Sequence, residues 1–477
     1  MAITASRLLA WAVPSSLQRR YPNQFSQVTK LADQIVSGRD DRAVAQRTAL
    51  FAFTIRILSA AIAYVSQVLL ARWMGGHEYG IFVVVWVGAV ILGGLSCLGF
   101  QTAVVRLVPE YQAAGSQDEL RGVVRGSLSY SFGAATLIAI VGISGVFLLS
   151  DLLTNYYVLP LYLGAICLPM LALSEVQDGV ARAFNWPNIA LTPTFIIRPM
   201  LILVAFGGAL SLGYSATAET ALIATIGATY VASLYQLLSL RRSLKKVVPA
   251  GGRTVHPLKW TLIALPIFLV EGFFNLLTNV DILVVGHYMP PDQVAVYFAS
   301  VKTLALVHFV YFAVKAGAAH RFSQYRAAGD HNQYQAFISD TVRWTFWPSV
   351  ALSALLLLVG EYLLLLFGEE FTQGYPLLFI LVIGIVARSA VGPAESVLTM
   401  SGEQKVCAGI YGVTLFLNVA LNITFIPIYG LYGAAISTSI AMMFEATALY
   451  AIAKRRLGIH LFIIGDQRPV ASAEAAE

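Results

Sequence analysis

The chain has 477 residues, of which 58% are hydrophobic and only 12% are charged, and its mean hydropathy is +0.73. Soluble domains carry about 25% charged residues, so this composition excludes a soluble globular enzyme and predicts an integral membrane protein. The formal net charge of +6 does not indicate nucleic-acid binding, because the cytoplasmic loops of membrane proteins are themselves rich in lysine and arginine.

Residues 1–47 are interpreted as a basic cytoplasmic arm. The apolar stretch RLLAWAV (7–13) is short and is followed by Pro14, with no cleavage site after it. This is not the pattern of a secretory signal. The arm is partly amphipathic, and its simplest interpretation is a solvated tail.

Twelve apolar runs predict membrane-spanning helices, because about 20 helical residues cross the hydrocarbon layer. In chain order, the runs are 48–70, 79–103, 126–149, 156–174, 189–212, 218–240, 260–286, 294–314, 344–367, 374–398, 405–428 and 431–453. Outside these runs, the lysines and arginines all fall in cytoplasmic segments if the N-terminus is cytoplasmic, with Arg72 as the exception. This asymmetry predicts that both termini are cytoplasmic and that the outer loops are short.

Three stretches of the first half recur in the second half at nearly one offset. The pairs are RWMGGHEYGIF (72–82) with HYMPPDQVAVY (287–297), EYQAAGSQ (110–117) with QYRAAGDH (324–331), and GYSAT (213–217) with LYGAA (431–435). Such a repeat predicts two lobes of six helices in the same orientation, related by a pseudo-two-fold axis along the membrane normal. The predicted segments are the arm 1–47, the lobe 48–240, a basic linker 241–259, the lobe 260–453 and a cytoplasmic tail 454–477.

Three arginines fall inside predicted spans: Arg56, Arg198 and Arg388. An ionisable side chain in a membrane span is costly unless it faces a cavity or a partner. The three lie at similar depths and are candidates to line a central cationic cavity, where the planar guanidinium suits a diphosphate. The alternative is local ion pairing. The candidate partners are Glu175, Glu395 and Glu445.

The seventh predicted span carries a polar stripe. Glu271, Asn275 and Thr278 share one helical face, which should face an aqueous path or the lobe interface. Glu271 is a candidate to bind a proton or sodium ion in a coupled cycle; the alternative is a buried carboxyl group that is protonated or paired with an arginine. Asp281 and Lys302 lie at matching depths on either side of an outer turn, which predicts a structural ion pair.

Motifs for chemistry are missing from the sequence. No Walker loop and no zinc-ligand spacing occur, so we expect no enzyme activity, no cofactor and no metal site. The cysteines, Cys97, Cys167 and Cys407, fall in apolar runs and are interpreted as packing residues.

Three motifs resemble one family. LLARWMGGHEYGIF (69–82) is similar to the first corner of the polysaccharide-exporter branch of the MATE-like multidrug/oligosaccharidyl-lipid/polysaccharide exporter superfamily. NVDILVVGHYMPPDQVAVYFASVKTL (279–304) resembles its seventh and eighth spans, and LNVALNITFIPIYGLYGAAISTSIA (417–441) resembles its last two. The resemblance covers about residues 45–455. It implies a flippase that moves undecaprenyl-diphosphate-linked oligosaccharide repeat units across the bacterial inner membrane, with membrane lipids, a polysaccharide polymerase and chain-length machinery as partners.

Three other functions fit the sequence less well. A cation or drug antiporter of the same superfamily would place carboxylates in the centre of the N-terminal half, but the first two predicted spans contain no acidic residue. A polysaccharide polymerase or membrane glycosyltransferase would need catalytic residues on a sizeable outer loop, and the predicted outer loops are short. A peptidoglycan-precursor flippase would usually carry two further C-terminal spans.

Overall fold

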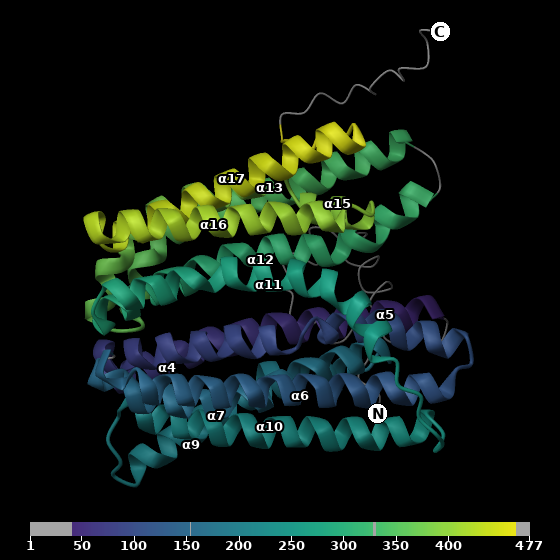
Figure 1. Ribbon diagram of the computed structural model, residues 1–477. Helices are drawn as coiled ribbons and strands as arrows, with labels where there is room; N and C mark the ends of the chain where they lie inside the picture. Colours follow the sequence, from purple (N-terminus) through teal and green to yellow (C-terminus); the bar gives the residue numbers. More distant parts are fainter. Residues whose placement is uncertain (1–40, 153, 328–330, 464–477) are drawn as a thin grey trace, which may run out of the picture. The chain divides into compact units, whose positions relative to one another are not determined.

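A computed structural model describes the backbone of residues 41–152, 154–327 and 331–463 and most side chains from residue 58 onward (Figure 1). The chain forms two compact units, Met1–Ala63 and Tyr64–Glu477. In the first unit the described residues belong to the beginning of a helix. The contacts given below lie within the second unit.

The described chain is almost entirely helical. The helices are α4 (Asp41–Ser96), α5 (Phe100–Ala113), α6 (Gln117–Leu148), α7 (Asn155–Ala183), α8 (Pro187–Thr192), α9 (Arg198–Ser211), α10 (Ala218–Val247), α11 (Pro257–Tyr288), α12 (Pro291–Ala327), α13 (His331–Leu365), α14 (Tyr375–Ser389), α15 (Ala394–Met400), α16 (Gln404–Tyr429) and α17 (Leu431–Leu457). The short helical turns are η1 (Ser150–Leu152), η2 (Pro193–Ile197) and η3 (Glu369–Gly374).

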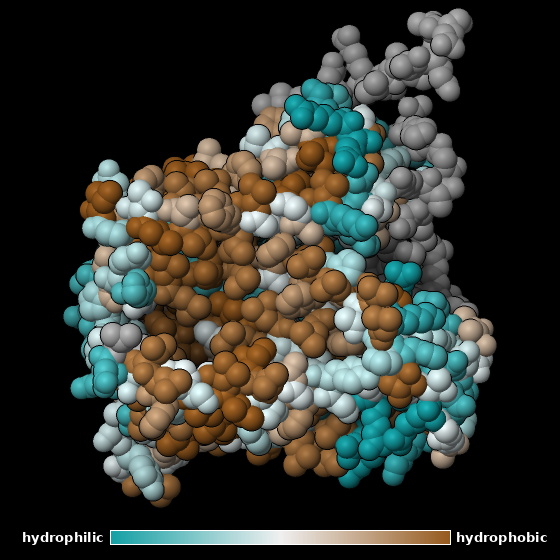
Figure 2. Space-filling view, in the orientation of Figure 1, coloured by the Kyte–Doolittle hydropathy of each residue, from teal (hydrophilic) through white to brown (hydrophobic). Residues whose placement is uncertain are grey.

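Within the described residues, eleven helices are long and apolar enough to cross a membrane. Figure 2 shows apolar side chains across the middle of the visible face, with polar side chains toward its two ends. This is the distribution that a hydrocarbon layer requires, because unpaired polar groups are excluded from it. The predicted all-α, multi-pass membrane fold is confirmed.

The first corner of the chain is a break inside α4. Gly75 has φ 74° and ψ 169°, a conformation that glycine adopts without steric cost. The apolar stretch Leu58–Ala113, which contains this break and the turn between α4 and α5, has 56 residues, which would measure about 84 Å as a single helix. A layer about 30 Å thick cannot hold that length in one straight pass, and the predicted turn at 71–78 contains the break.

The largest buried apolar cluster draws on both halves of the sequence. It contains Tyr79 and Phe82 of α4 together with Phe298 of α12 and Phe371 of η3. The Tyr79 ring lies edge-on to the rings of Phe298 and Phe371, with 6.1 Å between centroids in each pair. Aromatic pairs contribute about 0.5–1.5 kcal/mol beyond the burial of their area. The two halves are therefore packed tightly near the first corner.

Helix α11 belongs to two cores. Trp260, in its first turn, is buried with residues of α5, α6 and α7, and its Nε1 donates to the Tyr111 hydroxyl at 3.0 Å. Ile282 and Val285, near its other end, lie in the cluster that both halves share. Pro266, which lies between these regions, removes one helical hydrogen bond. The polar face of α11 is consequently placed between the two halves.

The loop at residues 248–256, which leads into α11, rests on the first turn of α6. Arg121 donates to the carbonyl oxygens of Gly252 at 2.7 Å and Pro249 at 2.8 Å, and it forms an ion pair with Asp118. The loop is thus held at the starting end of α11. The opposite end of α11 is about 48 Å away along the helix, where α12 begins.

Candidate functional site

The three arginines proposed for a cationic cavity have different surroundings. Arg56 lies in the beginning of α4, outside the side chains that the structure describes, so its role stays a prediction. Arg198 is the first residue of α9, and Arg388 lies in the last turn of α14. The sequence placed both inside spans, and the structure does the same.

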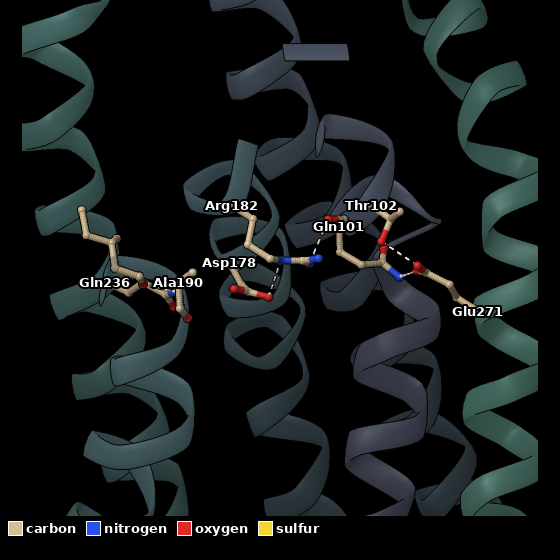
Figure 3. A network of polar contacts seen from close by, with 8 residues as sticks. Gln101, Thr102, Asp178, Arg182, Ala190, Gln236 and Glu271 are labelled. Carbon is tan, nitrogen blue, oxygen red and sulfur yellow. Dashed lines mark hydrogen bonds and ion pairs between the residues drawn. The ribbon is translucent and has the colours of Figure 1, made fainter. Parts of the chain in front are cut away.

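Arg198 follows an irregular π-helical turn, η2. Pro193 has no N–H, so the Ile189 carbonyl four residues earlier has no helical donor. Gln236 of α10 supplies one: its Nε2 donates to Ile189 O at 3.0 Å and to Ala190 O at 3.5 Å (Figure 3). The N–H of Arg198 donates to Pro193 O, five residues back, which is the π-helical pattern. Such turns change the direction of the side chains that follow and are frequent at functional sites.

The guanidinium group of Arg198 lies against an aromatic pair. Its Cζ is 5.6 Å from the centroid of the Trp86 ring, which is stacked on Phe82 at an interplanar angle of 8°. Among the side chains that the structure describes, no carboxylate oxygen lies within 4 Å of an Arg198 nitrogen, and the predicted alternative partner Glu175 forms no ion pair with it. The charge of Arg198 is therefore available to an anionic ligand.

Arg388 is neutralised locally. Its Nη2 lies 3.0 Å from Glu445 Oε1, and the two side chains are only 12% and 2% exposed. The guanidinium also lies over the rings of Tyr311, at 5.1 Å, and Phe274, at 5.9 Å. For this arginine the structure favours the ion-pair interpretation, with one of the three carboxylates that the sequence suggested.

A cavity of about 130 Å³ lies among α11, α12, α14, α16 and α17. The charged side chains that line it are two acids and two bases, Asp281, Glu445, Lys302 and Arg388. Their formal charges cancel, so the cavity is not cationic in this conformation. It has room for several water molecules but not for an oligosaccharide. Arg198 is not among the described residues that line it.

Asp281 and Lys302 both line this cavity, but the predicted ion pair between them is wrong. The Asp281 carboxylate accepts hydrogen bonds from the Tyr297 hydroxyl at 2.7 Å and from the Ile282 N–H at 3.0 Å. Thr438 of α17 donates to it at 3.4 Å. The Lys302 ammonium instead lies 4.8 Å from the centroid of the Phe298 ring. Neutral donors therefore hold the buried carboxylate in place of the lysine.

Glu271 connects α11 to the N-terminal half (Figure 3). Its Oε1 accepts a hydrogen bond from the Thr102 hydroxyl at 2.5 Å, and its Oε2 accepts one from Gln101 Nε2 at 2.6 Å. On the side of Gln101 away from Glu271, Arg182 of α7 donates to Gln101 O at 3.4 Å and pairs with Asp178 at 3.1 Å. The Glu271 carboxylate is thus held by donors of the N-terminal half. A change in its charge would therefore change the strength of the contact between the halves.

Small residues allow these helices to approach. A Cβ atom on Gly179 would lie 2.1 Å from Gln101 O, so α5 and α7 meet at this distance only because the residue is glycine. A Cβ atom on Gly94 of α4 would lie 2.6 Å from Asn275 Nδ2, so Asn275 also faces the N-terminal half. Asn279 donates to the backbone and side-chain oxygens of Asn275 at 2.9 and 3.1 Å. Glu271 and Asn275 of the predicted polar stripe thus lie toward α5 and α4, whereas Thr278 lines the cavity among α11, α12, α14, α16 and α17.

Sequence reasoning found the charged residues but missed several of their partners. The missed residues are Trp86, Gln101, Thr102, Gln236 and Thr438. One of them had a signal, because Pro193 inside a span predicts an unpaired carbonyl and therefore a donor on a neighbouring helix. The others are common residues whose role depends on helix packing.

The comparisons with known proteins agree with this architecture. Residues 266–424 match the MatE family model. A putative O-antigen transporter of Shigella flexneri is 23% identical over 428 residues, which cover 86% of this chain and 97% of the relative. The probable low-salt glycan biosynthesis flippase Agl15 of Haloferax volcanii is 22% identical over 250 residues, which cover 51% of each chain.

Solved structures share the fold at low sequence identity. An inward-facing multidrug resistance MATE family transporter of the MOP superfamily has a TM-score of 0.67 and 16% identity, covering 83% of this chain and 94% of its own. The lipid II flippase MurJ, in an inward closed conformation, has a TM-score of 0.65 and 16% identity, covering 85% of this chain and 87% of its own. Residues 266–424 thus match the MatE family, the two relatives are named as a transporter and a flippase, and the chain has the fold of MATE transporters and of MurJ.

Proposed function

We propose that this transporter is a flippase for undecaprenyl-diphosphate-linked oligosaccharide repeat units, which it moves across the bacterial inner membrane for polysaccharide biosynthesis. The observation that carries the proposal is Arg198. Its guanidinium lies in a membrane span beside Trp86, and no carboxylate of the described residues lies within 4 Å of it. A fixed cation that no carboxylate contacts directly suits an anionic cargo such as a diphosphate. The O-antigen and glycan-flippase relatives support the substrate class.

The proposed topology follows the sequence repeat. Counting the stretch with the Gly75 break as two passes makes twelve spans, arranged as lobes 48–240 and 260–453. Both termini, the arm 1–47 and the linker 241–259 are then cytoplasmic, as the basic residues predict. The lobes alternate in opening to the two sides, with the glycan in an aqueous lumen and the lipid tail in the bilayer. A polysaccharide polymerase and chain-length machinery are the proposed partners on the product side.

The ionisable residues divide into two roles in this mechanism. Arg198 binds the diphosphate, and Arg56 adds positive charge along its path; Arg388 contributes its charge when the movement of the lobes separates it from Glu445. Glu271, Asn275, Asp281 and Lys302 are the polar groups through which a proton or sodium gradient drives the cycle. Glu271 is the best placed of them, because its carboxylate is held by donors from the opposite half.

Deletion of the gene in its own host tests the substrate class. The expected result is loss of surface polysaccharide together with accumulation of the lipid-linked repeat unit in the inner leaflet, and both effects are reversed by the wild-type gene. The measurement is mass spectrometry of the lipid fraction combined with lectin access in sealed vesicles of known orientation. Unchanged surface polysaccharide with a defect only in drug or cation efflux would support the antiporter instead.

Glu271→Gln is expected to remove the dependence of transport on an ion gradient, because an amide cannot gain or lose a proton and does not attract a cation. Transport into vesicles is measured with and without an imposed proton or sodium gradient. Thr102→Val is the matched control: it removes one hydrogen bond to Glu271 but keeps the carboxylate, so the response to the gradient should persist. A Glu271→Gln protein that responds like the wild type would exclude this residue as the coupling site.

A further inference from the structure

Two helix caps attach the first corner, residues 72–80, to the C-terminal half. In one cap an acidic side chain accepts from a helix N-terminus, and in the other a basic side chain donates to a helix C-terminus. After the break at Gly75 the helix resumes at Gly76, whose N–H is one of the N-terminal donors that have no acceptor within the helix. This N–H donates to Glu370 Oε1 at 2.7 Å. The helix dipole favours a carboxylate at this position. Glu370 of η3 therefore caps a helix of the other half.

The second cap runs in the opposite direction. Arg72 Nε donates to Leu366 O at 2.6 Å, and its Nη2 donates to Leu365 O at 3.1 Å. Helix α13 ends at Leu365, so these carbonyls lie where the last turn lacks helical donors and where a cation is favoured. Each half thus supplies one charged side chain that caps a helix of the other half.

The backbones also meet closely at this corner. A Cβ atom on Gly80 would lie 1.9 Å from the carbonyl oxygen of Pro291, the first residue of α12. A Cβ atom on Gly76 would lie 2.9 Å from Glu370 Oε1. The glycines of the corner therefore serve the contact with the other half as well as the turn at Gly75.

This contact joins two positions that are equivalent in the sequence repeat. His77 Nδ1 lies 3.4 Å from Asp292 Oδ2, and the two residues are 215 positions apart. The repeated corners 72–82 and 287–297 align at the same offset, so His77 contacts its own counterpart. In a two-fold arrangement, equivalent residues meet each other at the axis. The contact also lies at the end of α11 opposite the loop held by α6, which is the outer side in the proposed topology.

We infer that Arg72, Gly76, Gly80 and Glu370, with the helix ends and backbone that they contact, form an outer latch. The latch holds the two halves together on the outer side, and both caps must separate before cargo can leave there. The inference rests on the proposed function, because only a protein that opens alternately to the two sides has to break this contact. Both caps are formed in this structure, so the latch is closed.

A cysteine below the latch reports its opening. Thr303 of α12 is fully buried, and its hydroxyl lies 3.2 Å from the Tyr64 hydroxyl, about 18 Å along the helix from Pro291. In the full-length Thr303→Cys protein, a membrane-impermeant maleimide added to the outer side should react slowly. Adding Glu370→Ala or Arg72→Ala should raise the initial rate about tenfold, because each removes a charge-assisted cap. The protein without Thr303→Cys gives the background from the native cysteines.

The matched control is Glu369→Ala. Glu369 is exposed like its neighbour Glu370, and it accepts a hydrogen bond from Thr372 through its backbone carbonyl. Its replacement therefore removes the same charge and leaves both caps intact. Labelling at the parent rate in Glu369→Ala and a faster rate in Glu370→Ala would support the latch; equal rates would overturn it. Glu370→Gln, which keeps the side-chain shape, should give an intermediate rate, and equal amounts of membrane protein exclude misfolding as the cause.

A disulfide between the two corners should have the opposite effect to the cap variants, because it keeps the latch closed. The double variant His77→Cys with Asp292→Cys, once oxidised, should stop both outer labelling of Thr303→Cys and transport, and a reductant should restore both. Transport at the normal rate through an oxidised protein would contradict the latch. The labelling experiment needs no glycan, so it tests the latch independently of the substrate. If the labelling results are as expected but the protein moves no lipid-linked glycan, only the proposed substrate is overturned.

Discussion

Arg198→Ala is expected to reduce polysaccharide export by about 10- to 100-fold, the effect of losing a charge-assisted contact to a diphosphate. The amount of protein in the membrane should stay the same. Arg198 contacts Trp86 in the folded protein, and a cation–π contact contributes only about 0.5–2 kcal/mol. Arg198→Lys keeps the charge but lacks the planar fork, so its export should be intermediate. Surface polysaccharide in the complemented deletion strain, normalised to membrane protein, is the measurement.

Arg125→Ala provides the matched control, because Arg125 is exposed on α6 and its loss removes the same charge from a different place. It should export normally. Equal export by Arg198→Ala and Arg125→Ala would exclude Arg198 from substrate binding. Gln236→Leu should resemble a weaker Arg198 variant, since it removes the donor that satisfies the carbonyl freed by Pro193.

Glu445→Leu is expected to cause the largest loss of stability, about 3–5 kcal/mol, because it leaves Arg388 buried without its counter-ion. The two side chains are only 12% and 2% exposed, so bulk solvent would screen the unpaired charge only weakly. The double variant Arg388→Met with Glu445→Leu removes both charges and should recover most of the stability, as apolar replacements of buried ion pairs commonly do. Thermal unfolding in detergent, followed by the amount of monodisperse protein, distinguishes the variants.

The same double variant separates the two roles of Arg388. If Arg388 only pairs with Glu445, the stable double variant should export normally. If it also carries positive charge for the diphosphate, export should remain low although the protein is folded. A single Glu445→Leu variant as stable as the wild type would contradict the structural importance of the pair.

The sequence predicted the all-α membrane fold because its signal is long. Apolar runs average over many residues, so single errors cancel. The first corner was located for the same reason: glycines and polar residues between two apolar runs can only be a turn. Its attachment to Leu365, Leu366 and Glu370 was not predictable, since those residues follow by almost three hundred positions.

The sequence showed which charged residues lie in the spans, but it did not predict which residues they contact. Depth along a helix suggested that Asp281 and Lys302 meet, yet depth does not tell which face each side chain occupies. Asp281 faces Tyr297 and Thr438, and Lys302 faces an aromatic ring. In contrast, Arg388 pairs with Glu445, one of the carboxylates that the sequence suggested, because few acidic residues lie in the spans.

Transfer of a defined substrate by the purified protein tests the proposed flippase most directly. The protein is reconstituted into vesicles whose inner leaflet contains an undecaprenyl-diphosphate-linked oligosaccharide, and the appearance of the sugar outside is followed with a lectin. The wild type should deliver the oligosaccharide much faster than protein-free vesicles, and Arg198→Ala should not exceed them. Wild-type vesicles that match protein-free vesicles for this lipid, but exchange organic cations for protons, would contradict the flippase and establish the antiporter.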